Sequence, residues 1–419
     1  MKESRSMSRI TAAMLAATLM IGCATEASSP SEKDYARELR PGESALELVT
    51  DRSQYPDFRA MWAERQRARA AYVKGLAWFE KPSSRNYYPF ESFTHDRVRR
   101  SLARLIEIID QADSPEEFAG RIALDFDVYR SVGWDGSGTV LFTAYYQPIF
   151  DGRVEPDAVY RFPLYRLPDD LVKADDGTPL GRRVGERVVS YPTRREIEEG
   201  RLLEGKRLEL VWLKSALDAF IIHVQGSAKI RLEDGRFLYV GYAGKTDRPY
   251  RSLGKALVED GRFPEEDLSL PRIREYFSRH PDALQDYLWK NESYVFFTET
   301  GPGGPWGSLG VPVTPFATLA TDKSIFPRGA PTAVETRLPV PSDAGVSARP
   351  FIALTADQDT GGAIRSPGRC DVFVGIGDEA ESIAGRTKYE GRLFYLLLKT
   401  DRAGEEEDTA SLGLPGSRP

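Results

Sequence analysis

The chain has 419 residues, of which 41% are hydrophobic and 29% charged, proportions typical of a soluble globular protein. The formal net charge is −6, and no basic stripe with interleaved aromatic residues is present, which argues against nucleic-acid binding. The three histidines are not at ligand spacing to one another, and no Walker loop, dinucleotide fingerprint or nucleophile elbow occurs, so we expect neither a metal nor a cofactor.

The N-terminus predicts an exported lipoprotein. Basic residues within 2–9 precede an apolar stretch over 10–22, which ends immediately before Cys23. This pattern is typical of a bacterial secretory signal, 1–22, followed by a lipoprotein cleavage site with Cys23 as the lipid-bearing first residue. About thirteen apolar residues are too few for a comfortable membrane span, so cleavage is favoured over an uncleaved anchor. Ala24 after the cysteine is associated with sorting to the outer membrane, where the protein would face the periplasm.

The first part of the exported chain predicts a tether and then helices. Residues 23–45 are polar and rich in Ser, Glu and Pro, as in a flexible tether. Residues 57–80 and 94–113 have helical spacing of their apolar positions. Strand signals then dominate over 139–146.

The middle third alternates helix and strand signals. Thr193 and Glu196 form the pattern of a capping box at a helix start. Apolar spacing over 208–223 predicts a further helix. Residues 229–242 alternate like a hairpin around the turn 233–235.

Residues 242–254 bring glycines, tyrosines and basic residues close together, before a short helix predicted to end near Asp260. Such a composition suits a groove that stacks on sugar rings and hydrogen-bonds their hydroxyls and carboxylates. An irregular surface loop is the alternative.

The last third predicts a small β-barrel, because short strands follow one another with turn signals at close intervals. The tail, 401–419, is acidic and is expected to be disordered. The expected strands are 311–315, 319–321, 333–338, 351–356, 370–374 and 393–398.

Two carboxylates, Asp359 and Asp371, lie on either side of a glycine-rich turn. With period two, Asp371 shares a strand face with Phe373 and Gly375, whereas Cys370 points to the other face. Apolar surroundings disfavour a charged carboxyl group, so Asp371 is a candidate proton donor. Cys370 is interpreted as a buried core thiol, and once Cys23 carries lipid no intramolecular disulfide is available.

Eight short runs, in order, resemble the membrane-bound lytic murein transglycosylase A family over roughly residues 90–400. Each run alone is a weak signal, but eight in sequence behind a lipoprotein signal are specific. The runs are Tyr145-Tyr146-Gln147-Pro148, Phe162-Pro163-Leu164-Tyr165-Arg166, Pro192-Thr193-Arg194, Val224-Gln225-Gly226-Ser227, Tyr242-Ala243-Gly244-Lys245, Tyr250-Arg251-Ser252-Leu253-Gly254, Asp322-Lys323-Ser324-Ile325 and Asp359-Thr360-Gly361-Gly362-Ala363-Ile364.

The resemblance implies a mainly β fold with helical segments, in which a double-psi β-barrel domain is split by an inserted second β-rich domain and a groove lies between them. The expected parts are a helical region, 46–140, associated with the barrel, an inserted glycan-binding domain, 141–293, and a catalytic barrel of the 3D type, 294–400.

The resemblance also implies a lytic transglycosylase, which cleaves the β-1,4 bond between N-acetylmuramic acid and N-acetylglucosamine in peptidoglycan and forms 1,6-anhydromuramyl products. Asp371 matches the family's catalytic acid, which would then act as the base, and Asp359 would support it. The expected substrate-binding residues are Tyr145, Gln225, Ser227, Lys245, Tyr250, Gly361 and Gly362.

Two alternatives stay open on the sequence alone. An inverting glycan hydrolase would use Asp371 together with Asp359. A non-catalytic lipoprotein would bind peptidoglycan without cutting it. Besides glycan strands and an outer-membrane lipid anchor through Cys23, a cell-wall synthesis complex is a candidate partner that the sequence does not identify further.

Overall fold

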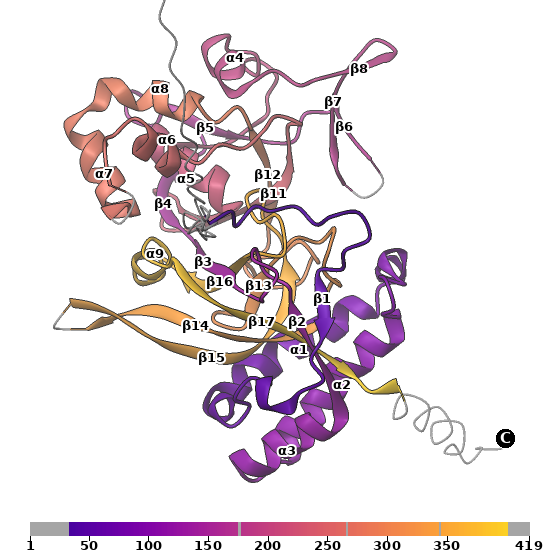
Figure 1. Cartoon of the computed structure of the whole chain (residues 1–419). Helices are drawn as coiled ribbons and strands as arrows, with labels where there is room; N and C mark the ends of the chain where they lie inside the picture. Colours follow the sequence, from indigo (N-terminus) through magenta and orange to yellow (C-terminus); the bar gives the residue numbers. More distant parts are fainter. Residues whose placement is uncertain (1–32, 175–176, 265–266, 343–344, 401–419) are drawn as a thin grey trace, which may run out of the picture. The chain divides into compact units, whose positions relative to one another are not determined.

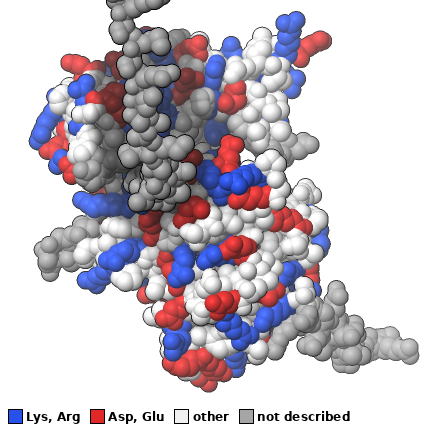
Figure 2. Space-filling view, in the orientation of Figure 1, with Lys and Arg blue, Asp and Glu red and all other residues white. Residues whose placement is uncertain are grey.

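The computed structural model describes residues 33–174, 177–264, 267–342 and 345–400. The predicted signal with Cys23 and the predicted disordered tail, 401–419, lie outside these ranges. Within them, every helix is too short or too polar to cross a bilayer. Acidic and basic side chains are interspersed on the face shown in Figure 2, as is usual for a surface in contact with water.

The tether prediction is wrong for its last part, because residues from Asp34 onward belong to the folded unit. The ring of Tyr35 packs edge-on against Trp134, with centroids 5.7 Å apart. Arg37 forms an ion pair of 3.0 Å with Glu43 and donates to the Trp134 carbonyl. A polar composition therefore concealed specific contacts to residues about a hundred positions away.

A helical region precedes the barrel. The predicted helices over 57–80 and 94–113 are confirmed, and a third, α3, was not predicted. Helix α2 begins after Thr94, whose hydroxyl accepts from the Arg97 backbone N–H. The elements are β1 (Leu46–Leu48), η1 (Arg52–Gln54), η2 (Ala60–Glu64), α1 (Arg65–Phe79), η3 (Pro82–Tyr87), α2 (His95–Gln111) and α3 (Pro115–Asp125).

Six strands close into a barrel, in the order β3-β17-β14-β15-β13-β16 and back to β3, and β1 and β2 extend the sheet from β17 (Figure 1). The mainly β fold with helical segments is thereby confirmed, and the expected strand 311–315 is wrong, since only an isolated bridge between Trp306 and Pro312 forms there. The strands are β2 (Phe126–Ser131), β3 (Val140–Gln147), β13 (Thr318–Ala320), β14 (Pro331–Ser342), β15 (Gly345–Asp359), β16 (Arg369–Ile376) and β17 (Tyr389–Leu398), with α9 (Asp378–Ala384) between the last two.

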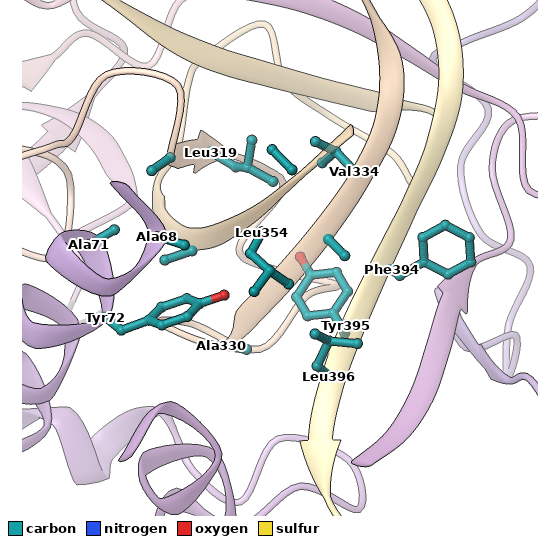
Figure 3. Close-up of a cluster of buried hydrophobic side chains, with 14 of the residues drawn as sticks. Ala68, Ala71, Tyr72, Leu319, Ala330, Val334, Leu354, Phe394, Tyr395 and Leu396 are labelled. Carbon is teal, nitrogen blue, oxygen red and sulfur yellow. The ribbon is translucent and has the colours of Figure 1, made fainter. Parts of the chain in front are cut away.

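The barrel core joins strands to the helical region. In Figure 3, Tyr72 of α1 points toward Leu354 of β15, and Tyr395 and Leu396 of β17 lie beside it. Tyr72, Tyr395 and Leu396 are fully buried, and Leu354 is 3% exposed. Burying a side chain such as Leu354 contributes about 1.5–3 kcal/mol, so helix α1 is part of the barrel's stability.

A six-stranded sheet, in the order β12-β11-β10-β4-β9-β5, and a three-stranded sheet, β6-β7-β8, make up the middle of the chain. The strands are β4 (Ile149–Arg153), β5 (Phe162–Tyr165), β6 (Leu171–Lys173), β7 (Pro179–Val184), β8 (Arg187–Val189), β9 (Glu209–Leu213), β10 (Ser227–Arg231), β11 (Phe237–Lys245) and β12 (Val295–Thr300). The helices are α4 (Arg194–Glu199), α5 (Ala216–Gln225), α6 (Leu253–Glu259), α7 (Leu270–Arg279), η5 (Pro281–Ala283) and α8 (Leu284–Trp289).

Local predictions in this part are mostly confirmed. The capping box of Thr193 and Glu196 begins α4, and the hairpin of β10 and β11 forms with Gly235 at φ +82°. The helix predicted over 208–223 is wrong in its first half, which is strand β9. Ser215 accepts from two backbone N–H groups and begins α5 there. A short apolar run is compatible with either a strand or a helix, and pairing with β4 and β5 makes this segment a strand.

The chain passes from the barrel to the six-stranded sheet between β3 and β4, and it leaves that sheet after β12. Strand β3 therefore lies inside the expected insert, 141–293, although it pairs in the barrel. Strand β12 lies outside that range, although it pairs with β11. The boundaries of the inserted part are set by pairing between strands far apart in sequence. Local sequence patterns do not reveal such pairing.

Candidate active site

The strand register places the two aspartates on either side of β13. Ala320 of β13 pairs with Asp359 of β15 on one edge and with Asp371 of β16 on the other. Asp371 pairs in turn with Thr143 of β3. Neighbouring strands lie about 4.8 Å apart, so the backbones of the two aspartates are separated by roughly 10 Å. The acids thus occupy one region of the barrel without sitting on adjacent strands.

The two faces of β16 differ as the sequence pattern predicts. Cys370 and Val372 are fully buried in the core, whereas Asp371 and Phe373 point the other way. The ring of Phe373 lies 5.2 Å from that of Tyr145, measured between centroids. Burial raises the pKa of the Cys370 thiol well above its ordinary value, which supports its interpretation as an unreactive core residue.

Asp371 is half-buried, and its Oδ1 accepts a hydrogen bond from the Thr143 hydroxyl. The Thr143 oxygen accepts in turn from Arg369 Nη2 at 3.3 Å. Burial raises the pKa of Asp371 from 3.8 to about 6, the charge of Arg369 opposes this rise, and the charge of Asp359 adds to it. At pH 7 a group with that pKa is protonated in roughly a tenth of molecules.

Asp359 is held by three donors. The Tyr145 hydroxyl donates to Oδ2 at 2.8 Å, and the backbone N–H groups of Ser308 and Thr360 donate to Oδ1 at 2.8 Å each. Burial raises the pKa of Asp359, and these hydrogen bonds oppose the rise. A carboxylate fixed by three donors is oriented as an acceptor and is poorly placed to activate water.

A buried ion pair lies inside the barrel near these acids. Lys323 Nζ pairs with Asp357, which also accepts from the Thr321 hydroxyl and from Tyr395 at 2.8 Å. Burial lowers the pKa of Lys323, and the charge of Asp357 opposes this effect. Sequence analysis named Lys323 only as part of a family run and missed this network. A further signal is Asp357, a charged residue within an otherwise apolar strand pattern.

Residues from the middle of the chain also reach the barrel. The Gln225 side-chain oxygen accepts from the Tyr146 backbone N–H at 3.1 Å, so this predicted binding residue has a structural bond. Lys245 lies beside Gly362 of the glycine-rich turn, 3.2 Å from where a Cβ atom would stand. Burial raises the pKa of Tyr250, and Arg369 and Asp371 are among the charges that act on it.

The structure therefore brings most of the predicted site residues together. The residues around the two acids are Tyr145, Lys245, Tyr250, Gly361 and Gly362, and the residues that sequence analysis missed are Thr143, Arg369, Asp357 and Lys323. Ser227 is half-buried at the start of β10, where it pairs with Gly241, and no contact joins it to either acid among the described residues.

Polar contacts connect helices from the middle of the chain to helix α9 and strand β3 of the barrel. Arg274 of α7 pairs with Glu381 of α9 at 3.2 Å and with Asp218 of α5 at 2.7 Å. The Tyr146 hydroxyl of β3 donates to the same Glu381 at 2.7 Å. These contacts fix β3, the strand that carries Thr143, against both parts of the chain.

The histidines and acids do not form a metal site in the part of the chain that the structure describes, where no group of three or more potential ligands is found. His223 is buried, and its Nδ1 lies 3.0 Å from Arg194 Nη2. Burial and the charge of Arg194 lower its pKa well below the ordinary value, so it is a neutral structural residue.

The six-stranded barrel and its acid define a 3D-domain protein. Residues 141–298 match the MltA specific insert domain, and residues 317–397 match the 3D domain. The chain belongs to the membrane-bound lytic murein transglycosylase A family. It is 35% identical to the protein of that name from Vibrio cholerae over 269 residues, which cover 64% of this chain and 68% of the relative. Identity to the Escherichia coli K12 protein is 33% over 272 residues, with 64% and 69% covered.

Solved structures give the same result. A membrane-bound lytic murein transglycosylase from Agrobacterium tumefaciens superposes with a TM-score of 0.70 and 28% identity, covering 86% of this chain and 99% of the other. The structure of Escherichia coli MltA with bound chitohexaose superposes with a TM-score of 0.63 and 26% identity, covering 88% and 99%.

Proposed function

We propose that this protein is a lytic transglycosylase of cell-wall turnover, which cleaves the β-1,4 bond between N-acetylmuramic acid and N-acetylglucosamine in peptidoglycan. The observation that carries the proposal is the asymmetry of the two acids. Asp371 is half-buried with a pKa of about 6, whereas Asp359 is fixed by three donors. Membership of the transglycosylase family supports the same reaction.

In this reaction protonated Asp371 gives its proton to the oxygen of the scissile bond, and the bond from muramyl C1 to that oxygen breaks. The resulting carboxylate takes the proton of the muramyl 6-hydroxyl, whose oxygen bonds to C1 and closes the anhydro ring. No water is consumed, because the nucleophile is already tethered to the substrate.

Thr143 and Arg369 determine which oxygen of Asp371 acts. The Thr143 oxygen accepts from Arg369, so its single hydrogen points to Asp371 Oδ1. The acidic proton is then carried by Oδ2. A glycan that covers the site removes water and further disfavours the charged form.

Asp359 acts as a positioning residue. It fixes the Tyr145 hydroxyl, and the Tyr145 ring packs on Phe373, two residues after Asp371. Its negative charge also raises the pKa of Asp371. The hydrolase alternative requires Asp359 to activate a water, and its three hydrogen bonds argue against that role.

The glycan strand would bind in a groove between the barrel and the inserted domain. The bound chitohexaose of the Escherichia coli relative is a precedent for a glycan ligand. By sheet membership the insert would run from about 148 to 300. The proposed contacts are Tyr145, Gln225, Ser227, Lys245, Tyr250, Gly361 and Gly362. A lipid on Cys23 would hold the protein at the outer membrane, facing the periplasm, where synthases of the wall are candidate partners.

Mass analysis of the products tests this proposal. Digestion of purified sacculi by the full chain should release muropeptides that are one water lighter than hydrolysed ones, and Asp371→Asn should release none. Products of hydrolysed mass would instead support an inverting hydrolase. Binding to sacculi without any release would support the non-catalytic lipoprotein.

A further inference from the structure

Lys245, at the end of β11, carries an ammonium group that forms no hydrogen bond or ion pair with the residues that the structure describes. Its side chain is half-buried. An ammonium group has three donors, and removing it from water without an acceptor is costly. Burial lowers the pKa of Lys245 accordingly. A ligand with a negative charge would recover this cost.

The position of Lys245 connects it to the catalytic motif. Its Nζ lies 3.2 Å from the point where a Cβ of Gly362 would stand. Gly362 belongs to the turn between Asp359 and Asp371, and it is exposed. Because glycine has no side chain, the ammonium group can approach the turn closely.

Arg365 follows Gly362 by three residues, so it places a second positive charge near the turn that Lys245 approaches. Its charge also lowers the pKa of Lys245, so the two cations act on each other. The Arg365 side chain is 57% exposed, and its ion pair with Asp322 is long, at 3.4 Å. The two cations repel each other, and a carboxylate bound by both would offset this repulsion and form charge-assisted hydrogen bonds.

We propose that Lys245 and Arg365 form a carboxylate-binding subsite beside the turn that leads to Asp371. The ligand would be a carboxylate on the arm of the muramyl residue. In peptide-free strands it is the lactyl carboxylate itself, and in peptide-bearing strands, where the lactyl group is an amide, it is a carboxylate of the attached peptide. The proposal rests on the proposed function, and it explains how the site would tell muramyl-containing strands from neutral chitin oligomers.

Binding measurements separate this subsite from catalysis. The full chain with Asp371→Asn would be titrated by calorimetry with peptide-free glycan strands, with soluble peptide-bearing strands, and with chitohexaose. Lys245→Met and Arg365→Met are added singly and together. Lys255→Met is the matched control, because the Lys255 side chain is 75% exposed on α6 with only a 4.0 Å ion pair to Glu259. Lys245→Arg tests whether charge alone suffices.

We expect Lys245→Met to weaken binding of at least one anionic ligand by about ten- to a hundredfold, the usual worth of a charged hydrogen bond. Chitohexaose binding should change less than about twofold, Lys245→Arg should retain most of the affinity, and the difference should shrink at high salt. A loss confined to peptide-free strands assigns the lactyl carboxylate, and a loss confined to peptide-bearing strands assigns the peptide.

Equal weakening for chitohexaose and the anionic strands would overturn the subsite, since Lys245 would then bind hydroxyl groups. Unchanged binding in the double variant would overturn it as well. Failure of the proposed function is recognised separately, because a wild-type protein that releases no anhydro products can still bind anionic strands in a Lys245-dependent way.

Discussion

Asp371→Asn should abolish cleavage and also stabilise the folded protein at neutral pH. The amide has nearly the shape of the carboxyl group, and its oxygen can accept the hydrogen bond from Thr143. It carries no charge, so the half-buried position no longer has to hold an ion. The carboxyl group of Asp371 is therefore expected to reduce stability in the wild type.

The pKa sets the size and sign of this effect. The value is 3.8 in the unfolded chain and about 6 in the folded protein. Below pH 3.8 both states are protonated and the wild type pays no penalty. As the pH rises toward 6 the unfolded state ionises first, and stability is lost. The penalty, at 1.36 kcal/mol per pKa unit, grows to about 1 kcal/mol at pH 4.5 and about 3 kcal/mol at pH 7.5.

Urea unfolding at the two pH values measures this difference. The free energy of unfolding of Asp371→Asn, relative to wild type, should rise by about 2 kcal/mol between pH 4.5 and pH 7.5. Asp169→Asn is the matched control, because Asp169 is exposed in a turn and has no hydrogen bond or ion pair among the described residues. Its relative stability should stay the same at both pH values.

Two results would refute the reasoning: a variant that is less stable than wild type at pH 7.5, or a variant whose stability relative to wild type is the same at both pH values. Asp371 would then be ionised without penalty in the folded protein. Its assignment as a proton donor would lose its physical basis, even if the variant were inactive.

Other residues of the site give three further expectations. In a pH profile of the wild type, kcat/KM should fall above pH 6. Asp359→Asn should move this fall to lower pH, because it removes a charge that raises the pKa of Asp371. A fall that stays at the same pH or moves to higher pH would contradict this. Lys323→Met or Asp357→Asn should each lower the free energy of unfolding by about 3–5 kcal/mol, and the double variant should recover part of it, whereas additive losses would show that the pair is not coupled. Cys370 should react with a thiol reagent only after unfolding, and rapid labelling of the native protein would place it outside the core.

The placement of Asp371 on its strand could be predicted because its signals are local. A glycine-rich turn between two acids and a strand with period two placed Asp371 opposite Cys370, and both faces are as expected. The repeated short strands likewise predicted the barrel.

Non-local pairing could not be predicted. Asp371 and Thr143 are 228 positions apart and meet only because β16 and β3 form a parallel ladder. The three-residue strand β13, expected over 319–321, fixes the separation of the acids, but so short a run does not reveal its two ladder partners. Apolar spacing predicts a helix where β9 forms, because the partners of β9 decide its conformation.

Strand β3 pairs in parallel with β16 over most of its length and antiparallel with β17 at its first three residues. The chain leaves the barrel at the C-terminal end of β3. Pairing within the barrel therefore holds Thr143 beside Asp371. Apart from the residues that contact β3 or α9, the segment between β3 and β12 can change its sequence over evolutionary time without moving the acid. With the glycan bound by that segment as proposed, substrate preference and bond cleavage can be selected almost independently.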